Sequence, residues 1–141
     1  MTDAHALTQL LDVSQARYDE QRQAFTLIVQ EESRLRSELA RLTKLDQASS
    51  LRQGSMLTMQ AIGADVQWQA WLGRSRTTLN MQLARVLALK DNEQAKVRTA
   101  FGKVTALQQI LAEELTQRKR AHADRVLQRA MDQTVLYRPL T

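Results

Sequence analysis

The stretch that decides the fold is residues 25–42, FTLIVQEESRLRSELARL. Its apolar residues recur at alternating steps of three and four, and the same stepping extends back to Leu7 and on to Ser49. The positions reached in this way are Leu7, Leu11, Ser14, Tyr18, Gln21, Phe25, Ile28, Glu32, Leu35, Leu39, Leu42, Asp46 and Ser49. Because eight of these thirteen positions are apolar, the repeat predicts a helix that packs through a coiled-coil seam.

The same repeat returns in the second half of the chain. Its positions are Leu79, Leu83, Val86, Lys90, Glu93, Val97, Ala100, Val104, Leu107, Leu111, Glu114 and Arg118. A polar stretch with Gly54 and Gly63 separates the two repeats, and such residues are typical of a connection. The pattern predicts an all-α fold, a long antiparallel two-helix coiled-coil hairpin that is a monomer. The expected parts of this single domain, residues 1–141, are a helix at about 3–50, a connection at about 51–64 and a helix at about 65–135.

These bounds also predict a register. If the helices end and begin near residues 50 and 65, the numbers of facing residues add up to about 115. The expected facing pairs are Leu11 with Val104, Tyr18 with Val97, and Gln21 with Gln94. A Gln facing a Gln in the seam can satisfy both amides and fix the register. Residues beyond about 113 then have no partner on the first helix and overhang it.

The composition gives no support for an enzyme or a metal site. There are no cysteines, aromatic residues make up 4%, and the two histidines, His5 and His122, have no second ligand at metal-binding spacing. No glycine-rich phosphate loop is present, and a narrow two-helix seam offers no cleft for catalysis. We therefore expect no enzymatic activity and no cofactor. No run approaches the roughly 20 apolar residues of a membrane span.

Two surfaces are candidates for partner binding. Trp68 and Trp71, the only tryptophans, stand three residues apart and share one helix face. They either cap the hairpin by packing on Leu42 and Leu45, or they form an exposed anchor for a partner. Because a two-helix seam cannot bury two indoles fully, we favour the anchor.

The second surface is the basic C-terminal end. Residues 118–141 hold six Lys or Arg against two Asp or Glu. The cluster consists of Arg118, Lys119, Arg120, Arg125 and Arg129. It is either a solvated helix end or a site for an acidic protein surface. Nucleic acid is a weaker alternative, since a basic leucine-zipper region precedes its heptads and here the order is reversed.

The chain resembles the FliJ/YscO-type proteins, the coiled-coil stalk of flagellar and injectisome type III secretion machines. The resemblance rests on the length, the two heptad-bearing helices, Trp68 and Trp71 opening the second helix, and the acidic-then-arginine pattern at Asp124 and Arg129. Ser49, Ser75 and Thr78 stand where the family tends to have aromatic or aliphatic residues. A diverged member is therefore expected.

The resemblance implies a function and its partners. The chain would be a non-enzymatic stalk that links a hexameric export ATPase to the cytoplasmic domain of the export-gate membrane protein and to export chaperones. It would be cytoplasmic and reach the inner membrane only through these partners. Gate contacts would map to Leu42, Leu45 and the tryptophans, and ATPase contacts to the basic cluster. A generic coiled-coil adaptor or scaffold, and a nucleic-acid-binding rod, remain the alternatives.

Overall fold

The computed structural model consists of two helices, α1 (Asp3–Gln53) and α2 (Met59–Leu136). It describes residues 3–53 and 59–137, and side chains are described except those of residues 52, 53 and 59–61. The described residues contain no strand, and the two helices pack against each other. The predicted all-α two-helix hairpin is therefore confirmed.

The helices meet along the predicted seam. All thirteen positions of the first repeat and all twelve of the second are buried or half-buried. The deepest apolar side chains are Leu35, Leu42, Leu72 and Val104. Because a two-helix contact shields only one stripe of each helix, the core stays narrow, and large apolar side chains such as Leu27 and Leu89 stay exposed.

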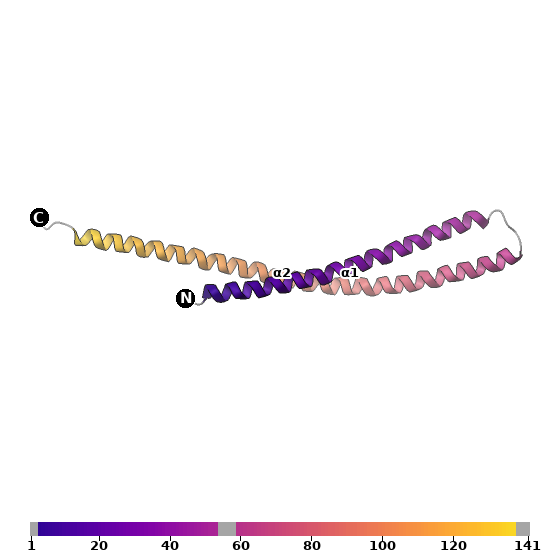
Figure 1. Cartoon of the computed structure of the whole chain (residues 1–141), viewed down its shortest axis with the longest axis horizontal. Coiled ribbons are helices and arrows are strands. Elements are labelled where there is room, and N and C mark those ends of the chain that lie inside the picture. Colours follow the sequence, from indigo (N-terminus) through magenta and orange to yellow (C-terminus); the bar gives the residue numbers. More distant parts are fainter. Residues whose placement is uncertain (1–2, 54–58, 138–141) are drawn as a thin grey trace. The chain divides into compact units, whose positions relative to one another are not determined.

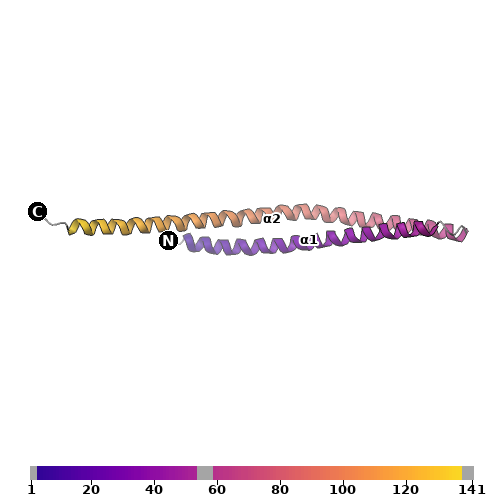
Figure 2. The ribbon, with the colours of Figure 1, turned by 90° about the horizontal axis from the view of Figure 1, so that it is seen from above.

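By contact density the chain divides into two units, each built from a stretch of both helices. We call Glu20–Val97 the hairpin-end unit, and Met1–Asp19 with Arg98–Thr141 the terminal unit. In the hairpin-end unit the two stretches run antiparallel (Figure 1). In the terminal unit α2 continues well past the N-terminal end of α1 (Figure 2).

The predicted connection was too long. Residues 51–53 belong to α1 and residues 59–64 to α2, while residues 54–58 lie outside the described part of the chain. Gly63 is a helical residue, and a Cβ added to it would meet no atom within 4 Å. A single glycine costs a helix only about 1 kcal/mol relative to alanine. It is therefore a weak stop signal among helix-forming neighbours, and Asp65 lies inside α2 instead of capping it.

The register is also displaced, by about one helical turn. In the terminal unit Tyr18 packs on Phe101, with ring centroids 5.7 Å apart, and Phe101 comes one turn after the predicted Val97. Contacting pairs in the two units have residue numbers that add up to between 115 and 122, about 119 on average. Leu11 then faces about residue 108.

The same displacement affects the hairpin-end unit. By the register of the Glu32–Lys90 pair, Gln94 lies opposite about residue 28, two turns from Gln21, so the predicted pairing of Gln94 with Gln21 is wrong. By the two contacts of Asp46 with α2, the end of α1 at Gln53 faces about residues 62–69, and α2 begins further out, at Met59. Side-chain pairing in the seam, and not the midpoint of the connection, therefore sets the register.

Candidate functional site

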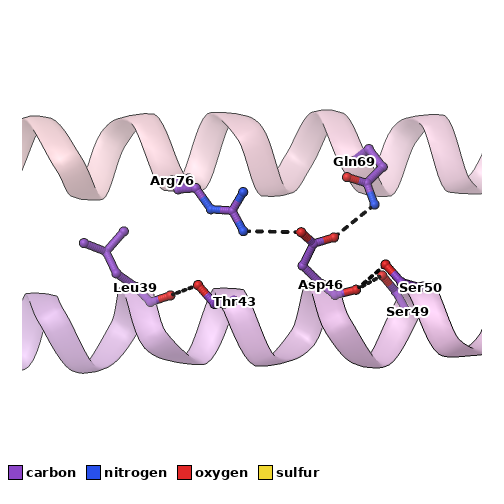
Figure 3. A network of polar contacts seen from close by, with 7 residues as sticks. All are labelled: Leu39, Thr43, Asp46, Ser49, Ser50, Gln69 and Arg76. Carbon is purple, nitrogen blue, oxygen red and sulfur yellow. Dashed lines mark hydrogen bonds and ion pairs between the residues drawn. The ribbon is translucent and has the colours of Figure 1, made fainter.

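Asp46 of α1 is the centre of a polar cluster in the hairpin-end unit (Figure 3). One carboxylate oxygen accepts a hydrogen bond from Gln69 Nε2 at 3.2 Å, and the other lies 3.5 Å from Arg76 Nη2. The hydroxyls of Ser49 and Ser50 donate to the Asp46 carbonyl. Asp46 thus ties α1 to two successive turns of α2 on either side of the buried Leu72.

Glu32 forms a second polar layer of the same kind. Its Oε2 lies 2.8 Å from Lys90 Nζ across the seam, and its Oε1 accepts a bond from Arg36 Nη2 at 3.1 Å. The residue is only 9% exposed. The hydrogen bond from Lys90 holds the pKa of Glu32 below its ordinary value of 4.5; burial acts in the opposite direction and Arg36 adds to the lowering.

The two polar layers have the same spacing on both helices, which was not predicted from the sequence. Glu32 and Asp46 are fourteen residues apart on α1, and Arg76 and Lys90 are fourteen apart on α2. In both ion pairs the residue numbers of the acid and the base add up to 122. This register could have been predicted from the sequence. Two acids at seam positions of α1 have the same spacing as two bases at seam positions of α2. Such polar seam positions specify register at some cost in stability.

The Glu32 layer predicts an acid-sensitive stability. Because the folded-state pKa of Glu32 lies below the ordinary 4.5, its contribution is complete above that pH and is lost as the pH falls through the folded value. Lys90→Met should lower the free energy of unfolding at neutral pH, since it leaves a carboxylate in the seam with Arg36 as its only remaining ion-pair partner. It should also shrink the further loss between neutral pH and about pH 3. Urea unfolding at several pH values measures both effects.

Lys96→Met is the matched control for Lys90→Met. Lys96 also forms an ion pair, with Glu93 at 3.0 Å, but it is half-exposed and pairs within its own helix. An ion pair between residues three apart on one helix contributes only about 0.2–0.5 kcal/mol. Equal acid dependence in both variants would show that Glu32 gains nothing from Lys90.

The tryptophans form a stacked pair near the start of α2. The Trp68 and Trp71 rings lie 5.1 Å apart at an interplanar angle of 24°. Trp68 is half-buried, whereas Trp71 is 43% exposed. The Trp68 indole N–H is buried, and it donates no hydrogen bond to any residue in the described part of the chain. One indole therefore supports the seam, and the other presents apolar surface to water.

Leu42 and Leu45 lie on the facing stretch of α1 but differ in exposure. Leu42 is 7% exposed and belongs to the core, while Leu45 is half-buried. Gln69, which lies between the two tryptophans in the sequence, bonds to Asp46, the residue after Leu45. The four predicted residues therefore belong to the same end of the hairpin-end unit, although Leu42 is part of the core. Three further apolar side chains at this end are exposed and were not predicted as part of the site: Leu51, Ile62 and Val66.

The basic cluster lies on the overhang of α2 in the terminal unit. Among the described residues of α2, Arg118 is the last half-buried one, and it pairs with Glu114 at 3.3 Å. Every described residue from Lys119 to Tyr137 is exposed. The predicted overhang is therefore confirmed, but it begins about five residues later than predicted because of the register.

No group of three His, Asp or Glu side chains gathers to hold a metal ion within residues 3–53 and 59–137. Neither helix, over the residues described, has a stretch both long and apolar enough to cross a bilayer. No protein-family model, characterised protein or solved structure matches this chain. The functional proposal therefore rests on the geometry of two surfaces, the tryptophan pair and the basic overhang of α2.

Proposed function

We propose that this protein is the non-enzymatic coiled-coil stalk of a flagellar or type III protein export apparatus. In this role the overhang of α2 binds the hexameric export ATPase, and the tryptophan end binds the cytoplasmic domain of the export gate. Export chaperones are further partners. The protein would work in the cytoplasm and meet the inner membrane only through the apparatus.

One observation carries the proposal: the last 19 described residues of the chain, Lys119–Tyr137, are exposed throughout and follow a paired helical segment. Between residues 118 and 137 there are five Lys or Arg against two Asp or Glu. A single basic helix that projects from a hairpin can enter an acidic cavity that is too narrow for two helices. The exposed Trp71, in the other unit, offers a separate contact for a second partner.

The proposal is tested by binding to purified hexameric export ATPase. Replacing Arg118, Lys119, Arg120 and Arg125 with Gln should weaken binding at least about tenfold at low salt. It should also flatten the salt dependence, because fewer ions are paired in the complex. Helicity should not change, since Lys119, Arg120 and Arg125 are exposed and Arg118 pairs within its own helix.

A control variant with the same loss of charge is available in the hairpin-end unit. Arg41, Lys44, Arg74 and Arg85 are all exposed there, and replacing these four with Gln should leave ATPase binding nearly unchanged. If the two variants weaken binding equally, the interaction depends only on the net charge of the protein and not on the basic cluster. If the wild-type protein fails to bind the ATPase, the proposed function is wrong and a generic adaptor becomes the better description.

A further inference from the structure

The overhang of α2 carries a second apolar face that the hairpin does not use. Along the terminal unit, the seam that packs on α1 runs through Val104, Leu107, Leu111 and Glu114 to Arg118. Continued by the same steps of three and four, it reaches Ala121, Arg125, Gln128 and Asp132, which are small or polar. The apolar seam thus stops where α1 stops.

A new stripe begins beyond that point. It consists of Ala123, Val126, Leu127, Ala130, Met131, Thr134 and Val135. Leu127 follows Arg118 by nine residues, which at about 100° per residue is a rotation of two and a half turns, so the two lie on opposite faces. Val126, Leu127 and Met131 are each at least half exposed. Ala130, Met131, Thr134 and Val135 line a shallow hollow on this face.

The position of the stripe excludes one occupant. Because it faces away from the side of α2 that packs on α1, a longer or repositioned α1 that continued along the seam would not cover it. Its width is also informative: from Val126 to Val135 it spans about half of the helix circumference. A seam between two helices is narrower than this, so a concave site with walls on more than one side fits better than a single partner helix.

The charge and the side-chain sizes favour an acidic protein over the other candidates. A second copy of the chain would bring the same excess of five Lys or Arg over two Asp or Glu, and like charges would repel. Insertion into a lipid surface is favoured by bulky aromatic and aliphatic residues, whereas this stripe has no aromatic residue and carries the small residues Ala123, Ala130 and Thr134 among its larger ones. Small residues between large ones suit close packing against protein.

We infer that the apolar stripe of the overhang, centred on Leu127 and Met131, is the surface that holds this chain in a concave, apolar site of its partner, with acidic groups at the rim of that site. The inference rests on the proposed function, in which that partner is the export ATPase. The two faces then have different tasks. The basic side chains speed the encounter, while the stripe slows dissociation.

Binding kinetics on purified hexameric export ATPase separate these tasks. Leu127→Gln with Met131→Gln should raise the dissociation rate at least about tenfold, and should leave the association rate and its salt dependence unchanged. The substitutions lie on exposed positions, so the helix should persist. The matched control replaces Leu89 and Met81 with Gln. These residues are of the same types, at nearly the same exposure, and lie in the hairpin-end unit. This variant should change neither rate.

Four results would overturn the inference. In the first, the stripe variant dissociates at the wild-type rate, while the variant with Gln at the four basic positions still binds weakly. The proposed function would then stand, but the stripe would have no part in binding. Wild-type protein that does not bind the ATPase would remove both. Stripe-dependent binding to vesicles of anionic phospholipid would assign the stripe to a membrane. Stripe-dependent self-association in sedimentation equilibrium would assign it to a second copy.

Discussion

Replacement of Leu35 by Ala is expected to reduce the free energy of unfolding by about 2–4 kcal/mol. Leu35 is fully buried, with 0% of its surface exposed, and it lies in the seam of the hairpin-end unit. Truncation removes buried apolar surface and leaves a space that neighbouring side chains fill only in part. Because only one stripe of each helix is covered, few other contacts can compensate. Urea unfolding followed by circular dichroism measures the loss.

Leu27→Ala is the matched control on the same helix. Leu27 is 66% exposed, and leucine and alanine have similar helix propensities. The change should stay within about 0.5 kcal/mol. Similar losses in the two variants would contradict the seam, since they would mean that burial does not distinguish these two leucines.

The seam itself could be predicted because a heptad repeat is a direct geometrical record of which side of a helix is covered. Polar members such as Glu32, Asp46 and Lys90 were included at positions that the structure places in the seam. Stepping through the sequence finds them whatever their chemistry, since the period and not the hydrophobicity of each residue sets the face.

The register could not be predicted in the same way. Sliding one helix past the other by one turn keeps apolar residues opposite apolar residues, so the repeat alone leaves several registers open. The choice depends on specific pairs. Glu32 with Lys90 and Asp46 with Arg76 both occur at one offset, and a slide would take each acid away from its base. A comparison of charged seam positions between the two helices would have given a better register than the connection did.

The exposure of the candidate site residues could not be predicted from the sequence alone. The tryptophan pair and the basic cluster were evident from composition and spacing, but the exposure of each member depends on the register. Leu42 illustrates the difference, because it was predicted as a partner contact and is 7% exposed in the core. The apolar stripe on the overhang was not predicted, because it lies on the face opposite the seam and the heptad stepping from Leu79 does not reach it.

Trp71→Ala is expected to weaken binding to the cytoplasmic domain of the export gate by about thirtyfold, while stability changes little. Under the proposed function Trp71 is a partner anchor, and truncating such an anchor typically costs about 2 kcal/mol or more of binding free energy, equivalent to that factor. Because 43% of the Trp71 surface is exposed, its truncation should lower the free energy of unfolding less than truncation of a core residue would. Titration with the purified gate domain and urea unfolding measure the two quantities.

Trp68→Ala gives the opposite balance and so serves as the comparison. Trp68 is half-buried beside the seam, although its indole N–H donates to no described residue, so its removal should cost more folding stability than removal of Trp71. The stacked arrangement couples the two rings, whose centroids are 5.1 Å apart, and some loss of gate affinity is therefore expected from Trp68→Ala as well. The discriminating quantity is the ratio of binding loss to stability loss, which should be larger for Trp71. A large drop in stability with unchanged affinity in Trp71→Ala would mean that both indoles serve the fold alone, and the gate contact would then have to lie elsewhere on the chain.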